Sequence, residues 1–194
     1  TGDVTISGGK ITTNSYSGYI VSVGRSYNEQ DQTVTITGGE FKNNLSEVEN
    51  TTGGHKAPVL VWDGSKSATV EATISNGQNG TTPKFEGFNT DLYRPGKDGQ
   101  VINPNSTLLV SGGTFDVAIE GKYIAPGFKL EENENGTYGV VVDPAYGKVA
   151  KIGDTYYATL EAALNAAQPG ETVTILAGDY TTNITINKAI TVEG

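Results

Sequence analysis

A short phrase built from alternating strand residues and a glycine pair occurs three times in this chain. In each copy apolar residues alternate with other residues, Gly-Gly interrupts the strand, and a further residue leads to an apolar one. Glycine permits backbone angles that other residues resist, so the phrase predicts a strand, a sharp corner and a second strand. The copies are Val4-Thr-Ile-Ser-Gly-Gly-Lys-Ile11, Val34-Thr-Ile-Thr-Gly-Gly-Glu-Phe41 and Leu108-Leu-Val-Ser-Gly-Gly-Thr-Phe115.

Repetition of the phrase predicts that its copies lie side by side. We expect them to stack in parallel, about 4.8 Å apart, with Ile6, Ile36 and Val110 in a shared aliphatic interior. One such coil buries little alone, so stability comes from stacking. The expected fold is therefore an all-β, right-handed parallel β-helix over residues 1–119. An antiparallel sandwich or barrel is the alternative, but hairpin signals do not follow nearly every strand, as those folds require.

Residues 120–147 have a different pattern and predict a β-hairpin. The turn is Asn133-Glu-Asn-Gly136, in which Asn-Gly supplies positive backbone angles, and it lies between Phe128–Glu131 and Thr137–Val142. We expect this hairpin to cap the open end of the stack, because an uncovered end offers unpaired main-chain groups.

Residues 148–194 predict a small α+β segment with one short amphipathic helix at 159–168. Thr159 is the expected N-cap, Glu161 suits the first turn, and Pro169-Gly170 ends the helix. The expected apolar face consists of Leu160, Ala163, Leu164 and Ala167. The expected strands are Lys148–Ile152, Thr155–Ala158, Thr172–Leu176, Asn183–Ile186 and Ile190–Val192.

The run from Thr159 to Tyr180, continuing through Ile184-Thr-Ile-Asn-Lys-Ala-Ile-Thr-Val-Glu-Gly194, resembles the opening of pectin lyase-like right-handed β-helices. The Gly-Gly-Thr-Phe phrase, the hairpin at Tyr123–Val142 and Val149–Leu160 also resemble modules of large cell-surface proteins from gut Gram-positive bacteria. The resemblance implies that residues 1 to about 147 end one β-helix and that residues 148–194 begin a second. It carries over no catalytic residue, because nothing here matches the family's acidic, Arg and Lys catalytic groups.

Charge and composition exclude several kinds of chemistry. A formal charge of −9 with 13 Lys and Arg leaves no basic stripe for nucleic acid. No apolar run of about 18 residues is present, so no membrane insertion is expected. Zero cysteines and the single His55 exclude a His/Cys metal centre. Glu131, Glu132 and Glu134 lack a calcium-loop motif and read as a solvated turn. We predict no catalytic residue, no metal and no cofactor.

Four aromatic residues are the candidate ligand-binding residues: Trp62, Phe85, Phe88 and Tyr93. On a shared face they would form a stacking platform for a sugar ring. The competing interpretation is that Trp62 packs in the core and that the other three pin a long loop to the stack. Long polar loops at Asn43–Lys56 and Gln78–Lys97 are where binding groups on a rigid stack usually lie.

The expected function is a structural or adhesive segment of a secreted or cell-surface bacterial repeat protein, without catalysis. The alternatives are a carbohydrate-binding module and a fragment of a polysaccharide-degrading enzyme. The expected partners are host or bacterial surface glycans or proteins. Head-to-tail self-association through open coil ends is also expected. Because Thr1-Gly2-Asp3 opens directly in repeat-like sequence, we expect the chain to be part of a longer protein.

Overall fold

The computed structural model describes residues 3–14, 21–23, 31–44, 59–61, 69–88 and 107–194. The chain divides into two compact units, Thr1–Val142 and Asp143–Gly194. The first unit contains β1 (Val4–Thr13), β2 (Val21–Val23), β3 (Gln32–Asn43), β4 (Val59–Val61), β5 (Val70–Ile74), β6 (Lys84–Glu86), β7 (Thr107–Val110), β8 (Thr114–Phe115), the 3-10 turn η2 (Gly121–Tyr123), β9 (Phe128–Glu132) and β10 (Tyr138–Val142). The second contains β11 (Ala150–Ile152), β12 (Thr155–Tyr157), α1 (Leu160–Ala166), β13 (Thr172–Ile175) and β14 (Thr191–Glu193).

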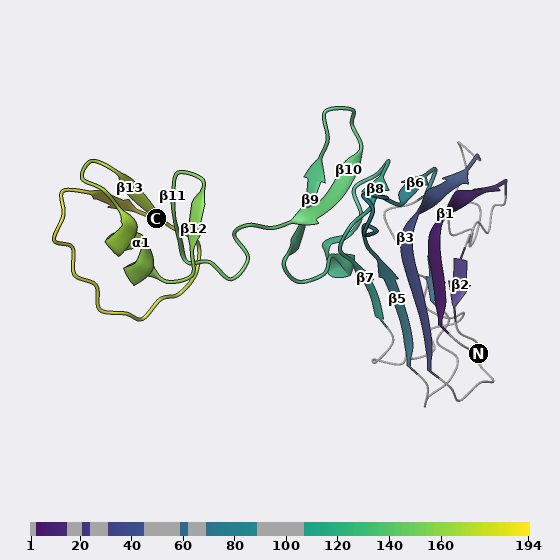
Figure 1. Cartoon of the computed structure of the whole chain (residues 1–194), viewed down its shortest axis with the longest axis horizontal. Coiled ribbons are helices and arrows are strands. Elements are labelled where there is room, and N and C mark those ends of the chain that lie inside the picture. The colour runs from purple at the N-terminus through teal and green to yellow at the C-terminus, as the bar shows by residue number, and fades with distance from the viewer. Residues whose placement is uncertain (1–2, 15–20, 24–30, 45–58, 62–68, 89–106) are drawn as a thin grey trace, which may run out of the picture. The chain divides into compact units, whose positions relative to one another are not determined.

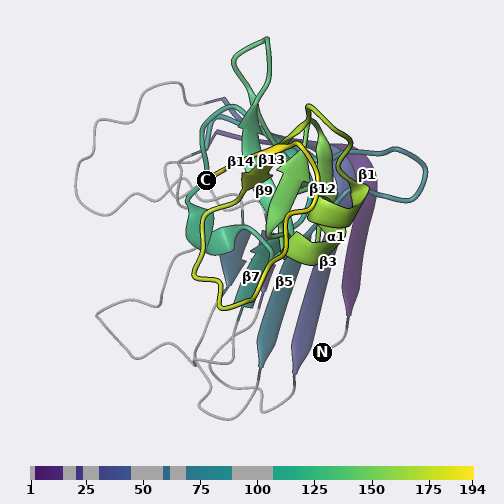
Figure 2. The ribbon, with the colours of Figure 1, turned by 90° about the vertical axis from the view of Figure 1, so that its left-hand side faces the viewer.

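The main sheet of the first unit is built around β3. Its strand order is β7-β5-β3-β6-β8-β10-β9, and β1 pairs with the opposite edge of β3 (Figure 1). One half of β3 pairs with β5 and the other half with β6, on either side of the glycine pair. Figure 2 shows β7, β5, β3 and β1 running side by side.

Copies of the repeated phrase lie in parallel register, as the sequence predicts. Ile6 is opposite Ile36, Ile36 opposite Ile74, and Ile74 opposite Val110. Strand β5 thus lies between the second and third copies. Ile36, Ile74 and Val110 are 1%, 0% and 0% exposed, and Ile6 is partly buried against the same cluster. The shared aliphatic interior is therefore present.

The prediction of a right-handed parallel β-helix is nevertheless wrong. The described strands of the main sheet form a curled half-barrel of mixed direction, not a solenoid. β8 pairs antiparallel with β10, and β10 antiparallel with β9. β2 and β4 form a separate two-stranded parallel sheet. The phrase determines which strands lie side by side, but it carries no information on how the chain returns between them.

The two glycines of the phrase have different physical roles. A Cβ added to Gly38 would lie 2.4 Å from the Ser7 carbonyl oxygen, so only glycine lets these strands approach so closely. Gly39 has φ of +106°, a conformation that L side chains rarely adopt. The first glycine therefore provides room for the neighbouring strand and the second provides the corner.

The predicted hairpin is present. β9 and β10 pair from Phe128↔Val142 to Glu132↔Tyr138. At the turn, Asn133 N–H donates to Thr137 O (2.7 Å), and Gly136 has φ of +78°. Its second strand pairs with the edge of β8, at Phe115 and Thr114, so the hairpin extends and covers that edge of the sheet.

The second unit packs α1 against a four-stranded sheet in the order β12-β11-β13-β14. Its core contains Ala150, Ala163, Leu164, Ala167 and Val173. The predicted helix is confirmed at Leu160–Ala166, and the Thr159 hydroxyl oxygen accepts from Ala162 N–H at 3.1 Å as the N-cap.

Strand β11 pairs antiparallel with both β12 and β13, whereas β13 and β14 are parallel, so the four-stranded sheet is of mixed direction. One expectation for this unit is wrong. Asn183–Ile186 is not a strand in the structure, although its residues alternate. All four residues are exposed, and an alternating pattern produces a strand only where a neighbour supplies hydrogen bonds.

Candidate functional site

Phenylalanine rings form a continuous column inside the first unit. Phe41 and Phe85 are stacked with ring centroids 4.9 Å apart, and Phe85 and Phe115 with centroids 5.0 Å apart. Phe41 on β3 and Phe115 on β8 are each the second residue after a glycine pair, and Phe85 on β6 is in register with both. Their exposed fractions are 2%, 3% and 1%. The rings are thus part of the core.

The candidate ligand-binding aromatics are only partly described. Phe85 is the middle ring of the column, and Phe88 contacts its edge at a centroid distance of 6.5 Å. Phe88 is buried, with 5% of its surface exposed. Trp62 and Tyr93 lie outside the described residues, as does His55. The structure therefore brings Phe85 and Phe88 together, in the interior, where neither ring presents a face to solvent.

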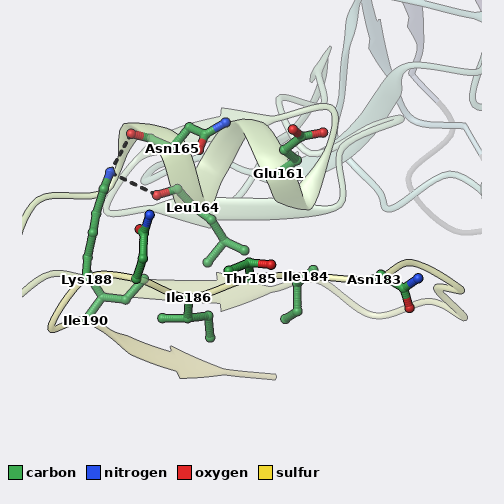
Figure 3. Close-up of a pocket in the computed structure, with 10 residues that line it drawn as sticks. Glu161, Leu164, Asn165, Asn183, Ile184, Thr185, Ile186, Lys188 and Ile190 are labelled. Carbon is green, nitrogen blue, oxygen red and sulfur yellow. Dashed lines mark hydrogen bonds between the residues drawn. The ribbon is translucent and has the colours of Figure 1, made fainter.

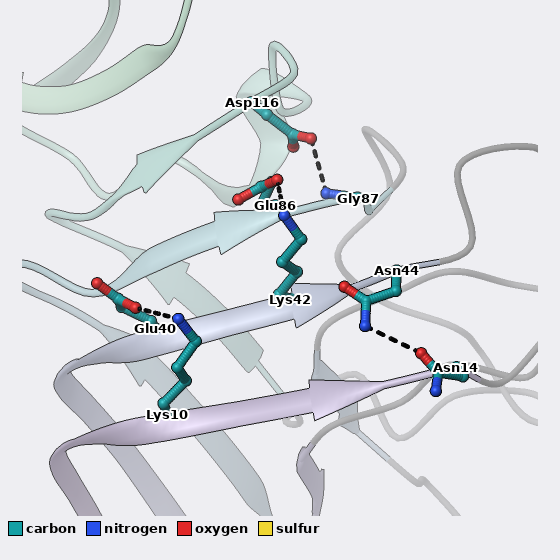
Figure 4. A network of polar contacts seen from close by, with 8 residues as sticks. All are labelled: Lys10, Asn14, Glu40, Lys42, Asn44, Glu86, Gly87 and Asp116. Carbon is teal, nitrogen blue, oxygen red and sulfur yellow. Dashed lines mark hydrogen bonds and ion pairs between the residues drawn. The ribbon is translucent and has the colours of Figure 1, made fainter.

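Polar side chains form a second set of contacts across the neighbouring strands (Figure 4). Lys10 on β1 lies 3.2 Å from Glu40 on β3, and Lys42 on β3 pairs with Glu86 on β6. Beyond the strand ends, Asn44 Nδ2 donates to Asn14 Oδ1 at 3.0 Å. These ion pairs are exposed, so each contributes little to stability, but each favours the observed register.

Carboxylate and amide groups also secure the turns. Gly87 N–H donates to Asp116 Oδ2 at 2.7 Å, and Gly113 N–H donates to Asn76 Oδ1 at 3.0 Å. Both bonds join segments that are distant in sequence and adjacent in the stack. Asp116 and Asn76 therefore act by satisfying main-chain amides that the corner leaves without a sheet partner.

A hollow of about 220 Å³ lies in the second unit, between α1 and the extended segment that follows β13 (Figure 3). Leu164 points from the helix toward this segment, and the rim includes Glu161, Asn165 and Asn183. Ile184 and Ile186 also line it and are 42% and 48% exposed. Leu164, Ile184 and Ile186 give the hollow an aliphatic lining, whereas Figure 3 shows the side chains of Glu161 and Asn165 pointing away from the extended segment.

Lys188 supplies the cation nearest this hollow, but its ammonium group is already engaged. Nζ donates to the carbonyl oxygens of Leu164, Asn165 and Ala167 at 3.2, 2.7 and 2.9 Å. These carbonyls are at the C-terminus of α1, where the helix dipole favours a positive charge. Lys188 therefore completes the helix end and is not poised to receive an anion.

The sequence pattern missed both the hollow and the role of Lys188. Lys188 is far along the chain from Ala166, the last residue of α1, and the final turn of the helix itself contains no basic residue. The usual sequence signal for a charge at the helix end is therefore absent. Its contact depends on the path of the extended segment, which local sequence does not determine.

Within the part of the chain that the structure describes, no group of three or more His, Cys, Asp or Glu side chains is arranged to hold a metal ion. Of the three acidic residues near the hairpin, Glu131 forms an ion pair with Lys129 at 3.1 Å. None of the helices described here has the length and apolar character needed to cross a bilayer.

No protein-family model, curated protein or solved structure matches the chain. What the sequence resemblance implies about source and location stays a prediction.

Proposed function

We propose that this chain is a structural segment of a secreted or cell-surface bacterial repeat protein, in which the stacked strands act as a rigid, non-catalytic spacer. The observation that carries the proposal is the column of Phe41, Phe85 and Phe115, with like residues stacked on like in one register. Such a column joins every strand it passes through into one packed body.

The distribution of side chains supports a mechanical role over a binding role. The described aromatic candidates contribute to the core, and the ion pairs Lys10–Glu40 and Lys42–Glu86 join adjacent strands to one another. The acidic composition, with a net charge of −9, suits a solvated extracellular surface that resists nonspecific association. The interior and the surface contacts thus both hold strands in register.

Binding assays with the whole chain test this proposal. A glycan array and pull-downs against bacterial and host surface proteins should retain no partner above background. Phe88→Leu serves as a matched variant, because a buried ring that only packs can be replaced by an aliphatic residue without altering retention. Tight retention of one defined glycan, lost in Phe88→Leu at unchanged melting temperature, would instead establish a carbohydrate-binding module.

Turnover assays separate the spacer from the fragment of a degrading enzyme. Incubation of the chain with pectin-like polysaccharides should release no reducing ends above the rate in buffer. Sustained release that depends on chain concentration, and is removed by heat denaturation, would overturn a non-catalytic role.

A further inference from the structure

Strand β1 carries the same phrase as β3 but is far more exposed. Val4 is 50% exposed whereas its register partner Val34 is 6% exposed, and Ile11 is 38% exposed whereas Phe41 is 2% exposed. Among the described residues β1 pairs only with β3. Along residues 4–8, the edge of β1 that faces away from β3 is therefore apolar and has no strand partner among the described residues.

Gly8 indicates that a strand fits closely against this edge. The corresponding first glycines Gly38 and Gly112 would each place an added Cβ 2.4 Å from main-chain atoms of Ser7 and Asn76, which belong to the preceding strand or its end. A Cβ added to Gly8 would meet nothing within 4 Å. Gly8 is thus the first glycine of its phrase, but no neighbouring strand lies close enough to require a glycine there.

A second unpaired edge of matching sequence lies in the other unit. Among the described residues β14 pairs only with β13. The stretch Ile190-Thr-Val-Glu-Gly194 has the pattern of Val4-Thr-Ile-Ser-Gly8, with aliphatic residues at the first and third positions and glycine at the fifth. Ile190 and Val192 are half-buried, so an additional strand would cover more of both.

Main-chain geometry identifies the groups on the outer edge of β1. Ser75 N–H donates to Ile36 O at 3.0 Å, so Ile36 faces β5. Alternate residues of a strand direct their main-chain groups to opposite edges, so Thr35 faces β1. In a parallel ladder the residue opposite it, Thr5, directs its own groups away. Thr5 N–H and C=O therefore point to the unpaired edge.

The unpaired edge of β14 has the complementary arrangement. Thr191 N–H donates to Glu171 O at 2.9 Å, so Thr191 faces β13. By the same alternation, Ile190 C=O and Val192 N–H point outward. With Thr191 opposite Thr5, Thr5 N–H can donate to Ile190 O, and Val192 N–H can donate to Thr5 O.

We propose that the chain associates head to tail, with β14 of one copy pairing in parallel with β1 of the next copy. The register places Ile190 beside Val4, Thr191 beside Thr5 and Val192 beside Ile6. Apolar residues then meet apolar residues, main-chain donors meet acceptors, and the end of β14 occupies the space beside Gly8. The contact uses two different surfaces, so each added copy leaves one of each surface free and more copies can add until a ring closes. The proposal goes beyond the spacer function and does not depend on it.

Sedimentation equilibrium of the whole chain, from about 10 µM to about 1 mM, measures this association directly. The weight-average mass should rise above that of the monomer as the protein concentration increases. A mass that stays at the monomer over the whole range would overturn the proposal, whereas a plateau at a small multiple of the monomer mass would indicate that the head-to-tail contacts close into a ring.

A pair of double variants, with like or opposite charges across the proposed contact, tests the register. Thr5 and Thr191 are both exposed, so charged residues there leave the folded units intact. Thr5→Asp with Thr191→Asp places like charges opposite each other, whereas Thr5→Lys with Thr191→Asp places opposite charges there. The second variant should associate roughly tenfold more strongly than the first at low salt. Equal association of the two, with unchanged melting temperatures, would contradict the register.

Cysteine cross-linking supplies an independent readout, because the chain contains no cysteine of its own. Thr5→Cys with Thr191→Cys should form intermolecular disulfides under mild oxidation and give a ladder of multimers on non-reducing gels. Thr12→Cys with Thr191→Cys is the matched control, since Thr12 is exposed on β1 beyond the corner and should not reach Thr191. Equal ladders from both variants would show random collision and overturn the proposed pairing.

Discussion

The first unit is stabilised by strands that are distant in sequence, whereas the second contains a helix whose beginning is specified by adjacent residues. In the first, Phe41, Phe85 and Phe115 stack although dozens of residues separate them. In the second, Thr159 caps α1 through the amide of Ala162. Apolar residues are therefore buried in two ways. In the first unit their burial requires a neighbouring strand that is distant in sequence, whereas in the second it begins with a helix that a local hydrogen bond starts.

Removing the middle ring of the column should have the largest effect. Phe85→Ala deletes a ring that contacts three other phenylalanines, and we expect the free energy of unfolding of the first unit to fall by about 3–5 kcal/mol. Denaturant titration monitored by amide hydrogen exchange reports each unit separately. The second unit should be unchanged, and Phe85→Leu should cost less than half as much. A uniform loss in both units would contradict their independence.

Substitution of the close-approach glycine should have the next largest effect. Gly38→Ala would force a Cβ against the Ser7 carbonyl, and we expect a loss of about 1–3 kcal/mol in the first unit. Gly8→Ala is the matched control, because nothing lies within 4 Å of its added Cβ. Thermal unfolding at low protein concentration, where chains do not associate, should show no destabilisation for Gly8→Ala. Equal losses at both positions would refute the distinction between inner and edge strands.

Loss of the Lys188 ammonium should destabilise only the second unit. Lys188→Met keeps most of the aliphatic stem but removes three hydrogen bonds to the end of α1, and we expect a cost of about 1–2 kcal/mol. Hydrogen exchange of the amides in Leu160–Ala166 measures it. Lys151→Met, on β11 of the same unit, controls for the change in net charge. Faster exchange in both variants would assign the effect to charge and not to the helix end.

Breaking an exposed ion pair should have the smallest effect. Lys10 and Glu40 have side chains that are 68% and 54% exposed, so Lys10→Met should cost less than about 0.5 kcal/mol. High salt should remove the difference from the unsubstituted chain. A larger, salt-insensitive loss in thermal unfolding would show that the Lys10 stem, and not its charge, stabilises β1.

Local chemistry accounts for the elements that could be predicted from sequence. The hairpin follows from Asn-Gly at the turn, and the helix from Thr159 and the spacing of Ala163, Leu164 and Ala167. The parallel alignment of Ile6, Ile36 and Val110 strands follows from the repetition of one phrase. In each case the determining residues are neighbours or share an identical pattern.

The errors arose where distant pairing decides the outcome. Asn183–Ile186 has the alternation of a strand but no sheet partner in the structure. The closed solenoid was predicted because the phrase repeats, yet closure depends on the connecting segments. The position of Phe88 against Phe85 likewise depends on the loop path and not on the spacing of aromatic residues.

At Gly38 and Gly112, the side that lacks a Cβ faces a residue earlier in the sequence, Ser7 and Asn76 respectively. This gives the stack a polarity that coincides with the direction of translation. When such a strand leaves the ribosome, the segment that its glycine approaches has therefore already been synthesised. Such a chain can fold vectorially, one layer at a time, and its nascent intermediates expose a single growing edge.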